Sequence, residues 1–120
     1  MVRIRRKYLD DIIRTIGTED IKVITGVRRS GKSFLLDDFK KYVIENIKDA
    51  NIISFDLSSL KYEELREYHA LNDYVEKHYV NNKRNFLFID EVQMCKGFEL
   101  ALNSLHASRK YDIYITGSNA

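Results

Sequence analysis

A glycine-rich run at residues 26–33, GVRRSGKS, has the residue types and the spacing that bind phosphate groups. It fits the pattern G-x-x-x-x-G-K-[ST] at every fixed position. Gly26 and Gly31 permit a loop tight enough for backbone N–H groups to converge on phosphate oxygens. The Lys32 ammonium suits the β- and γ-phosphates, and the Ser33 hydroxyl is a hard oxygen ligand for Mg²⁺. The run therefore predicts a site for a nucleoside triphosphate with Mg²⁺.

The whole loop and the start of the helix behind it make up the predicted phosphate site. Its residues are Gly26, Val27, Arg28, Arg29, Ser30, Gly31, Lys32, Ser33 and Phe34. A helix that begins near Lys32 would add the positive end of its dipole to the site. Arg28 and Arg29 occupy variable positions, and two interpretations stay open for them. Their side chains contact solvent or acidic neighbours, or one of them helps to hold phosphate or a bound partner.

Two adjacent carboxylates follow the apolar run FLFI at residues 86–89. Such a continuous apolar run is typical of a strand that is covered on both faces. Asp90 is expected to hold Mg²⁺ through a water molecule, and Glu91 to orient or deprotonate the attacking water. The alternative is a pair of ordinary solvated acids at a strand end. The phosphate loop upstream favours the metal site.

Short β-branched runs alternate along the chain with segments whose apolar residues recur every three or four positions. Strands are expected at 21–25, 51–57, 86–89 and 113–116, helices at 8–16, 32–47, 65–79 and 98–105, and a polar exit from the third helix at 81–85. This alternation predicts an α/β fold with a mainly parallel sheet and right-handed crossovers. Because ligands of such sheets bind at the carboxyl ends of the strands, the site is expected after Thr25, Ile89 and Thr116.

The composition indicates one packed domain and excludes several function classes. The chain has 120 residues, of which 44% are hydrophobic and 32% are charged, as expected for a single folded domain. A net charge of +2 is too small to argue for a nucleic-acid partner. Cys95 is the one cysteine, which excludes an intrachain disulfide and fits a cytoplasmic location. No apolar run approaches membrane-spanning length, and the three histidines lack the spacing of metal ligands.

The runs GVRRSGKSFLL, FLFIDEVQ and YITGSNA together resemble one prokaryotic group of AAA-superfamily P-loop ATPases, which often carry a nuclease-like C-terminal region. The resemblance covers nearly the whole chain, from about residue 2 to residue 120, and its first two runs correspond to the Walker A and Walker B motifs. It implies a three-layer sandwich that binds ATP. It also implies that Asn119, or failing that Ser118, is the sensor 1 residue that contacts the γ-phosphate or the attacking water. An ordinary Gly-Ser-Asn turn is the alternative for this segment.

The same resemblance implies the strand order 5-1-4-3-2, in which the strand ending at Thr116 lies between those ending at Thr25 and Ile89. The sequence departs from the family pattern at Ala120, directly after the sensor segment. The fifth strand, the helical lid and an arginine finger are not recognisable. Residues 1–120 are therefore expected to form an incomplete AAA-type core, truncated after the fourth strand. Its first strand would be left as an open edge that favours self-association.

Two classes of function remain after these considerations. The first is an ATP-hydrolysing module that drives a partner domain, with Lys32, Glu91 and Asn119 as its catalytic residues and Ser33 and Asp90 as its metal ligands. The second is a nucleotide-binding or interaction fragment without useful hydrolysis. A small-molecule kinase would need an acceptor site, and the sequence shows none. The absence of an N-K-x-D guanine signature favours ATP over GTP.

Overall fold

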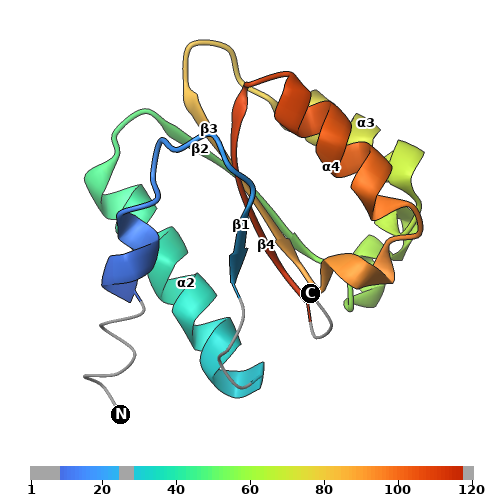
Figure 1. The fold of residues 1–120 in the computed structure, drawn as a ribbon, viewed down its shortest axis with the longest axis horizontal. Helices are drawn as coiled ribbons and strands as arrows, with labels where there is room; N and C mark the ends of the chain where they lie inside the picture. Colours follow the sequence, from blue (N-terminus) through green and yellow to red (C-terminus); the bar gives the residue numbers. More distant parts are fainter. Residues whose placement is uncertain (1–8, 25–28, 118–120) are drawn as a thin grey trace.

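Four parallel strands form the centre of the structure, a computed structural model that describes residues 9–24 and 29–117. For residues 29–34 only the backbone is described. The strands are β1 (Lys22–Ile24), β2 (Ala50–Asp56), β3 (Arg84–Asp90) and β4 (Tyr111–Thr116). They lie in the order β1-β4-β3-β2, and every pairing among them is parallel (Figure 1). The predicted α/β class is confirmed, and the order of these strands agrees with the one that the resemblance implied.

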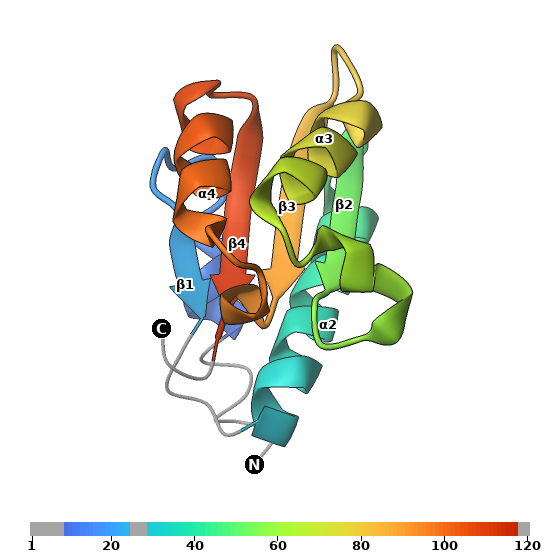
Figure 2. The same ribbon diagram turned by 90° about the vertical axis from the view of Figure 1, so that its right-hand side faces the viewer.

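Helices cover both faces of the sheet and make it the middle layer of three (Figures 1 and 2). Helix α2 (Arg29–Asn46) lies on one face together with the helical turns at residues 9–13. Helices α3 (Tyr68–His78) and α4 (Phe98–Ala107) lie on the other face. Two short 3₁₀ helices, η1 (Leu60–Leu65) and η2 (Val92–Met94), follow β2 and β3. No helix in the described part of the chain is long and apolar enough to cross a membrane.

Strand β3 is covered on both faces of the sheet, which explains its continuous apolar run at residues 86–89. Successive strand residues point to opposite faces, so Phe86 and Phe88 join the core under α2, while Leu87 and Ile89 join the core under α3 and α4. All four side chains are fully buried. Fully burying one such side chain stabilises a fold by about 1.5–3 kcal/mol. The run therefore anchors both layers of the sandwich and fixes the face on which the residue after Ile89 lies.

Three of the differences between the expected and the observed elements have a clear physical reason. The helix expected at 65–79 begins only at Tyr68, and Leu65 is instead the last residue of η1. Residues 66 and 67 leave the helical path where the backbone bridges to Lys96, whose N–H donates to the Arg66 carbonyl at 2.8 Å. Helix α2 begins at Arg29, three residues before Lys32, since a first turn needs no apolar residue to be helical. Finally, Asn85 is buried in β3 rather than part of a polar exit.

Asn85 is held in the sheet by a complete set of hydrogen bonds. Its amide nitrogen donates to the carbonyls of Val80 and Lys83 at 2.9 and 3.0 Å. Its amide oxygen accepts from the Val80 N–H at 3.0 Å and from the Asn51 side chain at 2.7 Å. The Asn85 side chain thus holds the turn between α3 and β3 together. This explains how a polar residue can be only 3% exposed.

We expect Asn85→Ala to lower the free energy of unfolding by about 2–3 kcal/mol, because it leaves buried backbone groups of the turn without partners. Urea unfolding followed by circular dichroism measures this loss. Asn46→Ala is the matched control, since Asn46 is exposed and makes one bond, to the Tyr42 carbonyl; its cost is expected to stay below about 0.5 kcal/mol. Equal losses for the two variants would contradict the structural role of Asn85.

Candidate functional site

The acidic residues that the sequence singled out lie at the carboxyl ends of the central strands. Asp90 is the last residue of β3, and Glu91 follows it directly. Thr116 is the last residue of the neighbouring strand β4. Helix α2 begins at the same edge of the sheet (Figure 2). This is the edge at which ligands of parallel α/β sheets bind.

Asp90 lies on the face of the sheet that α2 covers. Alternation along β3 places its side chain on the same face as Phe86 and Phe88, which pack against α2. Thr116 is on that face too, as is Tyr114 before it. The Thr116 hydroxyl donates a hydrogen bond to Oδ1 of Asp90. A carboxylate therefore stands, with a fixed orientation, on the side of the sheet where the phosphate run leads into α2.

Glu91 has a strained backbone that turns the chain out of the strand. Its φ of 56° and ψ of 53° are left-handed, which costs a residue other than glycine about 1–3 kcal/mol. Its N–H donates to the Thr116 hydroxyl at 3.0 Å, and Oε1 of its side chain accepts from Nε2 of Gln93 at 2.8 Å. Such strain persists only where the surroundings impose it, and it is often found at functional sites.

Sequence reasoning did not identify three polar residues at this edge. The sequence predicts Thr116 only as a strand end and assigns Gln93 and Asp56 no role in the site. Asp56 ends β2 in register with Asp90, and its Oδ1 accepts hydrogen bonds from the Ser58 N–H and hydroxyl at 2.9 and 2.7 Å. The Asp56–Ser58 spacing is a signal of such a turn. The roles of Thr116 and Gln93 depend on strand register and on η2, which leave no local signal.

Five of the other predicted site residues lie outside the described part of the structure. These are Gly26, Val27 and Arg28 in the loop and Ser118 and Asn119 after β4. The backbone from Arg29 to Phe34 is helical, as the first part of α2, but the side chains of Lys32 and Ser33 are not described. Their predicted contacts with phosphate and Mg²⁺ stay predictions.

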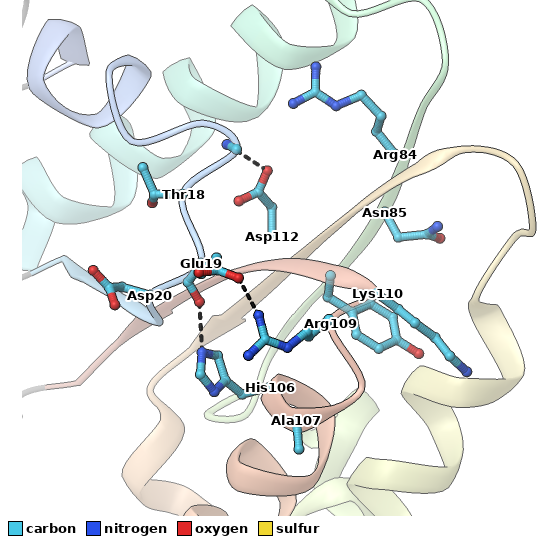
Figure 3. A pocket seen from close by; sticks show the side chains of 12 residues that line it. Thr18, Glu19, Asp20, Arg84, Asn85, His106, Ala107, Arg109, Lys110 and Asp112 are labelled. Atoms are coloured by element: carbon cyan, nitrogen blue, oxygen red, sulfur yellow. Dashed lines mark hydrogen bonds and ion pairs between the residues drawn. The ribbon is translucent and has the colours of Figure 1, made fainter.

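A cavity of about 580 Å³ lies at the opposite, amino-terminal edge of the sheet (Figure 3). Several of its lining residues are paired. Arg109 forms an ion pair with Glu19, and Asp112 pairs with Lys22 of β1 at 2.7 Å and accepts from the Gly17 N–H at 3.0 Å. These bonds tie the segment before β1 to β4 and to the end of α4.

Cys95 is not a reactive residue of the site. It is 1% exposed and packs in the core under α3 and α4. Burial raises the pKa of its thiol to about 11, with smaller contributions from the carboxylates of Glu67 and Glu99. Since the thiolate is the nucleophile and the metal ligand, a thiol with this pKa is inert at neutral pH.

Comparison with known proteins gives a family match and two relatives. Residues 18–120 match the family described as AAA domain. An uncharacterized protein of Haemophilus influenzae is 36% identical over 118 residues, which are 97% of this chain and 30% of that protein. An uncharacterized protein of Methanocaldococcus jannaschii is 27% identical over 104 residues, which are 85% of this chain and 22% of that protein. The chain thus spans less than a third of the length of either relative. No solved structure matches it significantly.

The family match agrees with the geometry of the site. It covers all four strands and the run GVRRSGKS, together with the two carboxylates at the end of β3. Proteins of this class bind nucleotides at the carboxyl edge of a parallel sheet, where Asp90 and Glu91 lie. The match includes most of the chain, and the chain therefore belongs to the AAA domain family.

Proposed function

We propose that the chain binds ATP with Mg²⁺ at the carboxyl edge of its sheet, as the nucleotide-binding part of an AAA-superfamily ATPase. The observation that carries this proposal is the placement of Asp90. Its carboxylate is fixed by Thr116 on the face of the sheet where α2 begins. The run GVRRSGKS ends within the first turns of that same helix.

The donor set suits Mg²⁺. This ion prefers oxygen ligands, keeps several waters, and is commonly bound through one or two carboxylates together with substrate phosphates. In the proposal, the Asp90 carboxylate and the Ser33 hydroxyl hold the ion, Lys32 contacts the β- and γ-phosphates, and Glu91 orients the attacking water. Asn119, or failing that Ser118, takes the sensor 1 position. Bound Mg²⁺ would neutralise charge that develops on the phosphates.

The alternative is a nucleotide-binding or interaction fragment that does not usefully hydrolyse ATP. The observation behind it is the length of the relatives, because this chain covers 30% and 22% of them. In related phosphoryl transfers, an arginine from elsewhere in the assembly contributes about 10³–10⁵ in rate. Binding and hydrolysis are therefore tested separately.

Calorimetric titration with ATP and with GTP, each with and without Mg²⁺, tests the binding proposal. We expect one site per chain, tighter binding of ATP than of GTP, and a clear gain in affinity from Mg²⁺. Phosphate release from the same sample then separates the two functions, because an interaction fragment binds without turnover. Absence of ATP binding at millimolar concentration, by a sample that is folded, would overturn the proposed function.

We further propose that the chain self-associates through the outer edge of β1. Among the described residues, β1 pairs only with β4, so its other edge has unpaired backbone groups. Val23 is 48% exposed. The Lys22 ammonium pairs with Asp112 and therefore does not protect the edge against pairing with another strand. The apolar side chains of residues 9–16 pack with α2 on the face of the sheet. A strand edge with unpaired backbone groups tends to pair with strands of other chains.

Sedimentation equilibrium at micromolar to high micromolar concentration is expected to show dimers or larger species. Val23→Lys adds a charge beside the edge and is expected to shift the chain to monomer. Ile44→Lys is the matched control, because Ile44 is 65% exposed on α2 and lies on the other face. A monomeric wild type, or equal effects of the two variants, would exclude association through β1.

A further inference from the structure

One buried hydroxyl contacts both acidic residues of the proposed site. Thr116 is 0% exposed. Its Oγ1 lies at 3.0 Å from the Glu91 nitrogen and also bonds to Oδ1 of Asp90. The direction of both bonds is fixed by chemistry. A backbone N–H can only donate, so Oγ1 accepts from Glu91, and an ionised carboxylate can only accept, so Oγ1 donates its one proton to Asp90.

The first bond fixes the orientation of the Asp90 carboxylate. Because Oδ1 accepts from the Thr116 hydroxyl, rotation of the carboxylate about its last torsion is restricted. Threonine suits this position because its two branches at Cβ restrict χ1. The hydroxyl also belongs to a rigid element, since Thr116 is the last strand residue of β4 and pairs with Ile24 of β1 on its other side.

The second bond fixes the point at which the chain leaves the strand. The ladder between β3 and β4 ends at the pair Ile89 and Ile115. Beyond it, the Thr116 side chain replaces a backbone carbonyl as the acceptor for the Glu91 N–H. The chain then enters the left-handed conformation at Glu91 and the 3₁₀ helix that carries Gln93. The Thr116 hydroxyl therefore contributes to the position of Glu91 relative to Asp90, together with the bonds that Glu91 makes to Gln93 and Met94.

We propose that Thr116 is a positioning residue, whose hydroxyl sets the Asp90 carboxylate for the metal ion and Glu91 for the attacking water. This inference rests on the proposed function, because it assigns the metal and the water to these two carboxylates. The inference predicts different effects on ATP binding with and without Mg²⁺. Loss of the hydroxyl weakens the contribution of Mg²⁺ to ATP binding, whereas binding of ATP without metal, which depends on the loop and on Lys32, changes little.

The test compares Thr116→Val, which has nearly the same shape but no hydroxyl, with Thr116→Ser, which keeps the hydroxyl. Calorimetry gives the Mg²⁺ gain, defined as the ratio of the dissociation constants for ATP without and with Mg²⁺. We expect Thr116→Val to lower this gain about tenfold, as loss of a charge-assisted hydrogen bond implies, and Thr116→Ser to restore most of it. Ser54→Ala is the control, because it removes another hydroxyl of the sheet, which accepts from Lys40 at 3.1 Å.

Amide hydrogen exchange at Glu91, measured without nucleotide, is the second readout. We expect its protection to fall in Thr116→Val and to be retained in Thr116→Ser and Ser54→Ala. Should Thr116→Val not fold, Thr116→Ala replaces it, because the smaller side chain leaves room for a water at the two unpaired groups.

The inference is overturned if a folded variant without the hydroxyl keeps the wild-type Mg²⁺ gain or the wild-type protection of Glu91. It is also overturned if Ser54→Ala lowers the gain as much as the Thr116 variant does. Failure of the proposed function looks different, because wild-type protein then binds no ATP. In that case, loss of protection at Glu91 in Thr116→Val would show a purely structural hydroxyl, and the positioning role is rejected.

Discussion

Lys32→Ala is expected to weaken ATP binding at least tenfold, which corresponds to about 1.4 kcal/mol or more. In the proposed site the Lys32 ammonium is the positive side chain that contacts the β- and γ-phosphates. Without it, the charge of these phosphates is balanced only by the backbone N–H groups and the metal ion. Calorimetry with Mg²⁺-ATP measures the loss. Because α2 already includes residue 32 and alanine is a good helix former, the variant is expected to stay folded.

Lys83→Ala is the matched control for this experiment. It removes the same charge from an exposed residue in the turn before β3, at the opposite edge of the sheet. Its affinity for ATP is expected to equal that of the wild type. Equal affinity of Lys32→Ala and wild type would instead contradict the assignment of the phosphate loop.

Glu91→Gln is expected to reduce single-turnover hydrolysis of ATP by about 10² or more, the contribution typical of a positioned general base. Binding is expected to change little, because glutamine keeps the size of the side chain and an oxygen that can accept from Gln93. Phosphate release is measured with the protein in excess over ATP, so that slow turnover can still be observed. The wild-type chain itself is expected to turn over well below about 1 per second.

Two outcomes would contradict this account of Glu91. If Glu91→Gln hydrolyses ATP as fast as the wild type, another group activates the water. If the wild-type chain by itself turns over faster than about 1 per second, and Glu91→Gln abolishes this activity, the chain needs no arginine from a partner. Gln93→Leu is a useful comparison, since it removes the hydrogen bond to Oε1 of Glu91 but keeps the carboxylate.

The parts of the fold that could be predicted are those with a strong local pattern. The apolar run at residues 86–89 indicated a strand buried on both faces, and its four residues are indeed buried. The spacing of Phe98, Ala101, Leu102 and Leu105 indicated a helix, and α4 spans them. The phosphate motif could be identified because its chemistry depends on a short, contiguous stretch of sequence.

The errors arose where distant segments decide the local structure. Apolar residues continue at helical spacing from Leu65 to Val75, but the backbone bridge between Glu67 and Lys96 interrupts the helix. Asn85 has the composition of a loop residue, and only the folded turn reveals that it can be buried with its bonds satisfied.

Thr116 shows the same limit within the site. In the sequence it is one of several β-branched residues of a strand. Its importance follows from the register between β3 and β4, in which Ile89 pairs with Ile115. This register brings its hydroxyl beside Asp90 and the Glu91 N–H. No spacing along the chain encodes a contact across 26 residues, so a sequence pattern could locate the two acids but not what positions them.

Titration of isotope-labelled protein with Mg²⁺-ATP, followed by backbone amide chemical shifts, tests the central claim most directly. The two edges of the sheet provide the comparison. The proposal predicts the largest shift changes at residues 26–34, 90–93 and 116–119, at the carboxyl edge. The chemical shifts of amides around the cavity at the amino edge, such as those of Gly17 and Arg109, are expected to change little. Changes concentrated around that cavity, with residues 26–34 and 90–93 unaffected, would contradict the proposed nucleotide site.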